Sequence, residues 1–230
     1  MDFKKEMNLT EEQEQKFYKY MQLLKEWNEK INLTTITEEQ DILLKHFIDS
    51  LTILKYLNDN DNIIDVGTGA GFPGIPVKIV NETLNVTLMD SLNKRILFLN
   101  DVIEKLQLKG IKSVHARAEE LGRNKEYREK YDVVTSRAVA NLSTLLEYMM
   151  PFAKVGGTCI CMKGPNIEEE LKNADLAIKE LGGKLEKIEN FKLPESDIER
   201  NIIIIKKVKN ISNKYPRKAG TPAKEPLINN

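Results

Sequence analysis

Apolar residues in the first 60 positions recur every three or four residues, which is the period of an α-helix. The first periodic run begins after Thr10 and Gln13, which are spaced as a capping box. A second capping-box pattern, Thr37 with Gln40, precedes another periodic run over residues 42–54. The first stripe must be buried and consists of Phe17, Tyr20, Met21, Leu24, Trp27 and Ile31. The sequence therefore predicts an N-terminal helical extension over residues 1–60.

From residue 62 the pattern changes to short β-rich runs that alternate with helical stretches. The predicted strands cover residues 62–66, 86–90, 111–115, 131–136, 157–163, 184–191 and 200–208. The predicted helices cover residues 74–81, 92–109, 141–152 and 167–181, and Gly110 and Gly182 follow two of their ends. Such alternation indicates βαβ units and a mostly parallel, doubly wound sheet of seven strands. The last two strands have no helix between them and should form an antiparallel hairpin at one edge.

The C-terminal end has an excess of basic over acidic residues, although the formal net charge of the whole chain is zero. Residues 206–230 carry seven basic residues against Glu225 alone, a net charge of +6. We divide the chain into the extension at 1–60, a sheet domain at 61–209 and a basic tail at 210–230. The tail is a candidate anion-binding arm, but a solvated end or a cap packed on its own domain fits as well. Pro216 and Pro222 disfavour regular structure there.

Composition excludes several classes of protein. The longest apolar run is only four isoleucines at 202–205, so we expect no membrane span and no secretory signal, and a soluble, cytoplasmic protein. Cys159 and Cys161 stand two residues apart in a strand-like run, a spacing that favours a reducing compartment over a disulfide loop or a metal pair. His46 and His115 are the only histidines. We therefore expect no metal site and no serine or cysteine triad.

A glycine-rich segment, Asp65 to Gly74, follows the first predicted strand and is the strongest local signal. Gly67, Gly69 and Gly71 stand at alternate positions, which lets the backbone turn tightly and approach a ligand closely. Ligands of doubly wound sheets bind at the carboxyl ends of the strands. The segment therefore predicts a nucleotide-like ligand, although a tight turn without a ligand also fits.

Two kinds of nucleotide remain open. Residues 69–74 match the dinucleotide fingerprint G-x-G-x-x-G, but Pro73 and Pro76 remove N–H donors from the helix start. The carboxylate of Asp65 would repel a pyrophosphate and attract an ammonium group. S-adenosylmethionine carries an ammonium, a sulfonium and no phosphate. Asp90 ends the second strand, where its two oxygens can accept both ribose hydroxyls or cap the next helix.

These segments resemble the cofactor half of class I S-adenosylmethionine-dependent methyltransferases, which implies a Rossmann-like fold. Further motifs resemble the bacterial family of 16S ribosomal RNA guanine-N7 methyltransferases, also called glucose-inhibited division protein B. The glycine loop continues as Phe-Pro-Gly-Ile-Pro, the most specific part of the match together with the tryptophan motif upstream. The other matching segments are 27–34, 46–50, 90–95, 118–120, 136–138 and 163–164, with 215–222 matching only some members.

The resemblance implies S-adenosylmethionine as the cofactor and 16S rRNA, in a small ribosomal subunit or an assembly intermediate, as the partner. It implies that Gly67 and Phe72 line the cofactor site and that Ala118 and Glu119 hold the adenine. It also implies that Arg137 lies beside cofactor and acceptor. From the residues alone, two alternatives stay open: Glu119 as a first-turn helix acid and Arg137 in a salt bridge to a nearby helix. The complete predicted cofactor set is Asp65, Gly67, Gly69, Gly71, Phe72, Asp90, Ala118, Glu119 and Arg137.

Basic residues near the expected site or in the tail are candidates for contact with RNA: Lys94, Arg95, Lys163, Lys214, Arg217 and Lys218. The pattern assigns no roles to Asn32, His46 and Asp49, and Trp27 is expected to belong to the core. We expect a monomer.

The chemistry implied by the resemblance is simple. N7 of guanine has an exposed lone pair, so methyl transfer needs in-line placement and no general base. Two alternatives are an NAD(P)-binding oxidoreductase that uses the same glycines and a non-catalytic RNA-binding assembly factor that uses the tail.

Overall fold

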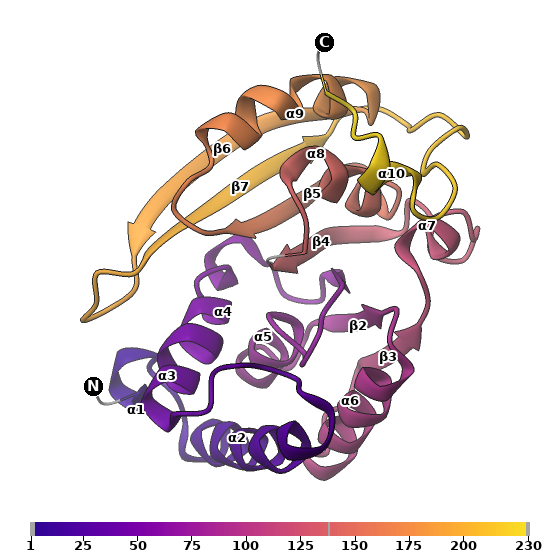
Figure 1. Ribbon diagram of the computed structural model, residues 1–230. Helices are drawn as coiled ribbons and strands as arrows, with labels where there is room; N and C mark the ends of the chain where they lie inside the picture. The colour runs from indigo at the N-terminus through magenta and orange to yellow at the C-terminus, as the bar shows by residue number, and fades with distance from the viewer. Residues whose placement is uncertain (1–2, 138, 229–230) are drawn as a thin grey trace.

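The computed structural model describes residues 3–137 and 139–228, and a seven-stranded sheet with helices on both faces forms its centre (Figure 1). The strand order is β3-β2-β1-β4-β5-β7-β6, with β7 antiparallel to both of its neighbours and the other pairs parallel. The strands are β1 Asn62–Val66, β2 Asn85–Asp90, β3 Ile111–His115, β4 Tyr131–Arg137, β5 Ala153–Lys163, β6 Gly183–Lys192 and β7 Glu199–Lys207. The predicted mostly parallel sheet with an antiparallel edge hairpin is confirmed.

Successive residues of the central strands belong to two different cores. Ile63 of β1 packs in a core with α2, α5 and α6, whereas Ile64 packs in a core with α8 and α9 on the opposite face. The four isoleucines of β7 alternate in the same way, two to each core. Side chains of a strand point alternately to the two faces, so a sheet covered on both faces needs continuous apolar runs.

All four helices predicted for the sheet domain are present, each somewhat shorter than predicted. Gly110 and Gly182, which follow two of them, have positive φ angles of 66° and 76°. Such angles favour glycine, and Gly182 directly follows the C-cap residue of α9, as predicted. The C′ position predicted for Gly110 is wrong, because the C-cap residue of α6 is Leu106, four residues earlier. The helices of this domain are α5 Gly74–Val80, α6 Asn93–Lys105, α7 Ala118–Leu121, α8 Leu142–Met149 and α9 Glu168–Glu180.

The N-terminal extension shares the core of the sheet domain. It begins with α1 Phe3–Glu6 and α2 Glu11–Ile31, and the predicted capping box of Thr10 with Gln13 is present. The apolar stripe of α2 packs against α5 and α6. Trp27 packs at the edge of this core, as predicted, and its Nε1 donates to Asp101 Oδ2 on α6 at 2.7 Å.

The second predicted helix of the extension is divided into short segments. They are α3 Glu39–Ile42, a π-helix at Leu43–Ile48, α4 Asp49–Leu51 and a 3₁₀ turn at Leu54–Tyr56. The predicted capping box at Thr37 is wrong, because Glu38 is the N-cap residue and makes no side-chain cap. A π-helix of this kind often marks a functional site.

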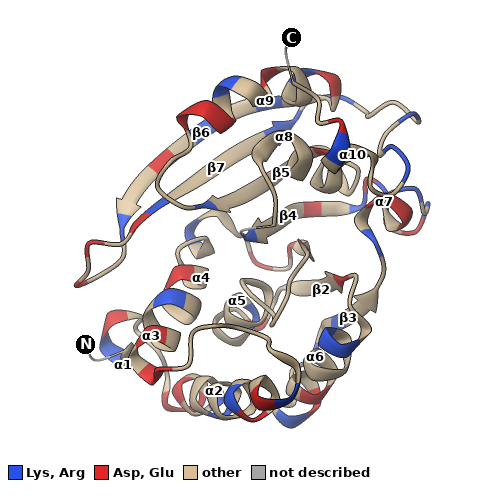
Figure 2. Cartoon of the chain, viewed as in Figure 1, with Lys and Arg blue, Asp and Glu red and all other residues tan. Residues whose placement is uncertain are grey.

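The basic tail packs on the sheet domain and covers part of the core beside α8. Ile211, Tyr215 and Pro222 are buried, and α10 Thr221–Lys224 is a short helix despite the prolines. The expectation that the prolines prevent regular structure there is therefore wrong. Basic residues occur along the tail near α7 and α10 (Figure 2).

The strongest contact of the tail is a two-pronged ion pair. Arg217 Nε lies 3.0 Å from Glu147 Oε1, and Arg217 Nη2 lies 2.6 Å from Glu147 Oε2. The Glu147 side chain is 1% exposed. Arg128 adds hydrogen bonds to the carbonyls of Ile211, Ser212 and Tyr215. The tail is therefore packed on its own domain and is not a solvated end, and its binding of anions stays a prediction.

Both cysteines lie in β5, buried against the methionines at and just after the end of α8. Burial raises the pKa of both thiols, that of Cys161 to about 12. Within the described ranges, no helix is long and apolar enough to cross a membrane.

The packing of the tail gives a first prediction. Arg217→Ala leaves the buried charge of Glu147 without its ionic partner, so we expect a loss of about 3 kcal/mol in the free energy of unfolding. Urea unfolding measures this loss. Lys218→Ala removes an exposed charge one residue away and should change stability by less than about 0.5 kcal/mol. Equal effects of the two substitutions would show that the ion pair does not hold the tail.

Candidate functional site

A cavity of about 450 Å³ opens at the carboxyl ends of β1, β2 and β4. This is the edge at which doubly wound sheets bind ligands. Of the predicted cofactor residues, the cavity is lined by Gly67, Gly69, Phe72, Asp90 and Arg137. Arg95, predicted as an RNA contact, lines it as well. Residues that the sequence analysis did not assign to the cofactor complete the lining: Leu33, Thr34, His46, Thr68, Ala70, Ser91 and Val139.

The three loop glycines have different local surroundings, although each has a positive φ angle. A Cβ on Gly67 would meet the side chain of Val139 at 2.8 Å, and one on Gly71 would meet Tyr20 Oη at 2.6 Å. A Cβ on Gly69 would meet nothing within 4 Å. Gly69 therefore presents bare backbone to the open cavity, whereas Gly71 lies below the loop against the protein.

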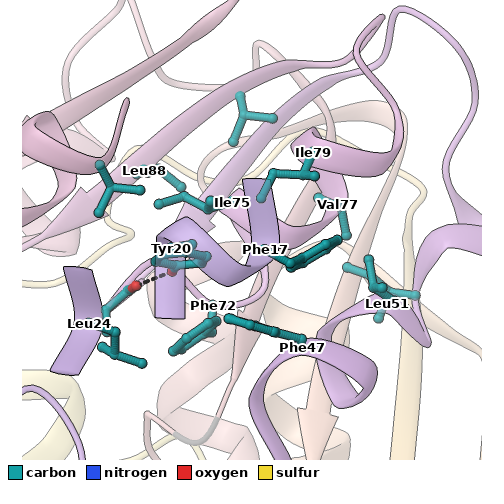
Figure 3. Close-up of a cluster of buried hydrophobic side chains, with 14 of the residues drawn as sticks. Phe17, Tyr20, Leu24, Phe47, Leu51, Phe72, Ile75, Val77, Ile79 and Leu88 are labelled. Carbon is teal, nitrogen blue, oxygen red and sulfur yellow. Dashed lines mark hydrogen bonds between the residues drawn. The ribbon is translucent and has the colours of Figure 1, made fainter. Parts of the chain in front are cut away.

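An aromatic cluster supports the loop from below. The Tyr20 hydroxyl donates to the carbonyl oxygen of Ala70. Its ring lies 5.3 Å from the ring of Phe47 and 5.5 Å from that of Phe72. Figure 3 shows these rings together with Phe17 and the side chains of α5. The N-terminal extension thus fixes the position of the loop.

Asp65 lies underneath the loop and does not line the cavity. Its Oδ2 accepts hydrogen bonds from Thr68 Oγ1 at 2.6 Å and from the Gly74 amide at 2.9 Å. Its Oδ1 is buried and has no hydrogen-bond partner in the structure. Burial raises the pKa of this carboxyl to about 6. At neutral pH Asp65 is thus a buried negative charge beneath the glycines.

Asp90 reaches the cavity and already accepts three hydrogen bonds. Its Oδ2 accepts from the Gly69 amide at 2.9 Å and from Arg95 at 3.1 Å, and its Oδ1 accepts from the Leu92 amide. Asp90 is not the N-cap residue of α6, since Leu92 has that position. A carboxylate has about four acceptor positions, so one position on Oδ1 remains for a ligand hydroxyl.

Arg137 ends β4 with its guanidinium 4.9 Å from the centre of the Phe72 ring. One nitrogen donates to the Lys45 carbonyl at 3.0 Å and pairs with Asp49 Oδ2 at 3.2 Å. The other lies 3.1 Å from His46 Nδ1. Arg137 thus forms a salt bridge and also lines the cavity, and its place beside cofactor and acceptor stays a prediction.

His46 is a neutral imidazole in this environment. A guanidinium has no acceptor, so His46 Nδ1 must accept from Arg137, and Nε2 then donates to Thr34 Oγ1 at 2.8 Å. Burial, followed by the nearby charge of Arg137, lowers the pKa of His46 to about 3. Its ring stacks on Phe72 at 4.5 Å. The sequence left the role of His46 open, and the structure places it at the cavity wall.

Ala118 and Glu119 do not line this cavity. The Glu119 carboxylate accepts from the Gly220 amide of the tail at 2.9 Å. It lies in the first turn of α7, as the alternative interpretation proposed.

The candidate RNA contacts differ in accessibility. Lys163 is buried, donates to the Ala140 carbonyl and pairs with Glu170 at 2.6 Å. Its side chain is thus unavailable to RNA in this conformation, and Arg217 is likewise paired with Glu147. Lys214 pairs with Glu180 at 3.1 Å but remains 61% exposed. Lys94 and Lys218 are exposed.

The family model described as rRNA small subunit methyltransferase G (GidB) matches residues 13–203. This match covers most of the chain. The chain belongs to that family. A protein from Acetivibrio thermocellus named ribosomal RNA small subunit methyltransferase G is 58% identical over 96% of this chain and 91% of its own length. One of the same name from Desulforamulus reducens is 55% identical over 96% of this chain and 93% of its own length.

Solved structures show the same fold at low sequence identity. M. jannaschii TYW2 in complex with AdoMet has a TM-score of 0.55 and 18% identity over 74% of this chain and 77% of its own. M. capricolum TrmK in complex with S-adenosyl-homocysteine also has a TM-score of 0.55, with 21% identity over 71% of this chain and 69% of its own. The predicted Rossmann-like methyltransferase fold is confirmed. Family membership also confirms the predicted methyltransferase activity and its cofactor, S-adenosylmethionine.

The loop geometry gives a second prediction, on two glycine substitutions. In Gly69→Val the side chain points into open cavity, so the fold should survive a backbone strain of about 1–2 kcal/mol while cofactor binding is lost. In Gly71→Val the side chain collides with Tyr20 and Ile75, so the fold itself should fail. Thermal melting and calorimetric titration with S-adenosylmethionine measure the two effects. Unchanged affinity in a folded Gly69→Val variant would contradict this assignment of the cofactor site.

Asp65 gives a third prediction, on pH dependence. Its pKa is about 6 in the folded protein against an ordinary 3.8, so the folded state holds the proton more tightly. Its contribution to stability is present below pH 4, is lost between about pH 4 and 6, and stays lost above pH 6. Relative to Asp65→Asn, the wild type should therefore lose about 3 kcal/mol across this window. Urea unfolding at pH 4, 5, 6 and 7 measures the difference, and a flat difference would refute the burial of a charged Asp65.

Proposed function

We propose that this protein transfers a methyl group from S-adenosylmethionine to N7 of a guanine in 16S rRNA. One observation supports the N7 assignment: the imidazole that lines the cavity cannot act as a base at neutral pH, and the lining carboxylate, Asp90, is already paired with Arg95. His46, the natural candidate, has a pKa near 3, and Arg137 occupies its Nδ1 lone pair. Methylation at N7 uses a free lone pair and removes no proton, so it needs no such base.

The residues around the cavity fit the proposed cofactor. When bound, S-adenosylmethionine supplies an electrophilic methyl group on a cationic sulfur. Two arginines at the cavity, Arg95 and Arg137, are each paired with an aspartate. Asp65 adds a third carboxylate without a cation of its own. The negative charge of Asp65 beneath the glycines favours a ligand with ammonium and sulfonium groups over one with a pyrophosphate.

Each side chain then has a proposed task. Gly67 and Gly69 allow the cofactor to approach the backbone, and Asp90 accepts a ribose hydroxyl on Oδ1. Arg137 positions the acceptor guanine through its O6 edge or its phosphate. Phe72 and the neutral His46 form a stacked apolar wall that excludes water. The roles of Ala118 and Glu119 toward the adenine remain predictions.

We propose that the exposed Lys94, Lys214 and Lys218 contact phosphates of the RNA, in a small subunit or an assembly intermediate. Phosphate contacts dominate affinity for nucleic acids. Such a substrate implies a cytoplasmic location. We further propose that the protein acts as a monomer, because its large exposed apolar side chains are scattered over several elements. The comparisons with known proteins favour neither the oxidoreductase nor the assembly factor.

A mapping experiment on small subunits tests the proposal. Subunits from cells that lack the gene are incubated with protein and S-adenosylmethionine, and N7-methylguanine is located by borohydride reduction and aniline cleavage. We expect one cleavage site that depends on protein and cofactor. Methylation of another atom, or of none, would refute the N7 assignment.

Arg137→Ala provides the residue-level test. We expect a folded protein that binds S-adenosylmethionine and loses at least about 100-fold in turnover, since placing the acceptor is worth this much. Lys192→Ala, which removes an exposed charge of β6, serves as the control and should change turnover little. Wild-type turnover of Arg137→Ala would reduce Arg137 to a structural role.

A further inference from the structure

The guanidinium of Arg137 is held by groups of the N-terminal extension. Arg137 belongs to β4, whereas its partners Lys45, His46 and Asp49 lie more than 80 residues earlier in the chain. The geometry of the cavity therefore depends on a segment outside the sheet.

The π-helix is what makes one of these partners available. In an α-helix the amide of Asp49 would donate to the carbonyl of Lys45, four residues before it. Here it donates instead to the carbonyls of Leu44 and His46. The Lys45 carbonyl can then accept from Arg137 at 3.0 Å.

Asp49 joins Arg137 to a second arginine. Its Oδ2 lies 3.2 Å from Arg137, and its Oδ1 lies 3.2 Å from Nε of Arg200 at the start of β7. The Asp49 side chain is 4% exposed, whereas that of Arg200 is 22% exposed. A single buried carboxylate thus links the cavity to the sheet edge hairpin.

We propose that Asp49 and Arg200 are positioning residues for methyl transfer: Asp49 holds Arg137 over Phe72, and Arg200 holds Asp49 in place. This role rests on the proposed function, in which Arg137 places the acceptor guanine. Removing the charge of Asp49 leaves two neighbouring arginines with no carboxylate between them. Their repulsion moves Arg137 off the Phe72 ring and so misplaces the acceptor.

The kinetic test uses Asp49→Asn, which keeps the size of the side chain. We expect kcat to fall roughly 10- to 100-fold, because a small misplacement has an effect of this size, while KM and the cofactor Kd change little. Asp197→Asn is the matched control, since it removes the carboxylate of the exposed pair with Lys192 on the β6–β7 hairpin. Arg200→Lys should retain more activity than Arg200→Gln. Wild-type kcat in both Asp49→Asn and Arg200→Gln would overturn the proposal.

A second test measures the pKa of His46 by NMR on the protein alone. The charged groups around His46 are Arg137 from β4, Asp49 and Lys45 from its own segment, Arg200 from β7 and Asp65 beneath the loop. Loss of the negative charge of Asp49 alone would lower the pKa of His46 or leave it unchanged. Departure of Arg137 would raise it, because this cation holds the pKa down.

The sign of the shift therefore decides the outcome. A rise in Asp49→Asn, in the same direction as in Arg137→Ala, supports the proposal, and a fall or no change overturns it. His115, which ends β3 and is not part of this network, serves as the internal reference. If Asp49→Asn does not fold, the same measurement is made on Arg200→Lys, which keeps the positive charge and loses the Nε contact with Asp49. This test needs no RNA, so it stands even if the wild type fails to methylate small subunits and the proposed function falls.

Discussion

A guanidinium removed from water needs partners, and much of the arrangement around the cavity follows from this requirement at Arg137. Its charge is met by a carboxylate, a backbone carbonyl and an imidazole nitrogen. Burial without such partners would cost several kcal/mol. The same contacts hold the cation over Phe72, and together with burial, the larger cause, the charge of Arg137 keeps His46 neutral. The partners that the charge of Arg137 requires therefore influence both the shape of the cavity and the protonation state of His46.

The N-terminal extension is consequently part of the site as well as part of the core. Tyr20 supports the glycine loop from below through Ala70, and the segment around His46 closes the cavity from the side. Both contacts join residues distant in sequence but close at the carboxyl edge of the sheet. A cofactor site on the sheet alone would lack one wall and the partners of its arginine.

The sequence predicted the sheet well because strand and helix periods are local properties of a chain. All seven strands were found within a few residues, and the glycine loop identified the edge of the sheet that binds ligands. The π-helix was not predictable, because its altered hydrogen bonds depend on Arg137 as a partner more than 80 residues away. For the same reason the sequence did not show that Lys163, a candidate RNA contact, is buried and paired with Glu170 in the folded protein. The accessibility of a charge is a tertiary property.

The packed tail also changes the electrostatic interaction of the whole protein with a polyanion such as RNA. Residues 1–205 carry a net charge of −6, which the +6 of residues 206–230 balances. Arg217 pairs with Glu147 and Lys214 with Glu180, so part of this balance is made by direct contact between tail and body. An acidic body alone would be repelled by RNA at distances up to a Debye length of about 8 Å. Because the basic tail packs on the acidic body, the protein avoids this repulsion. It also avoids the non-specific binding of polyanions that a strongly cationic surface would cause.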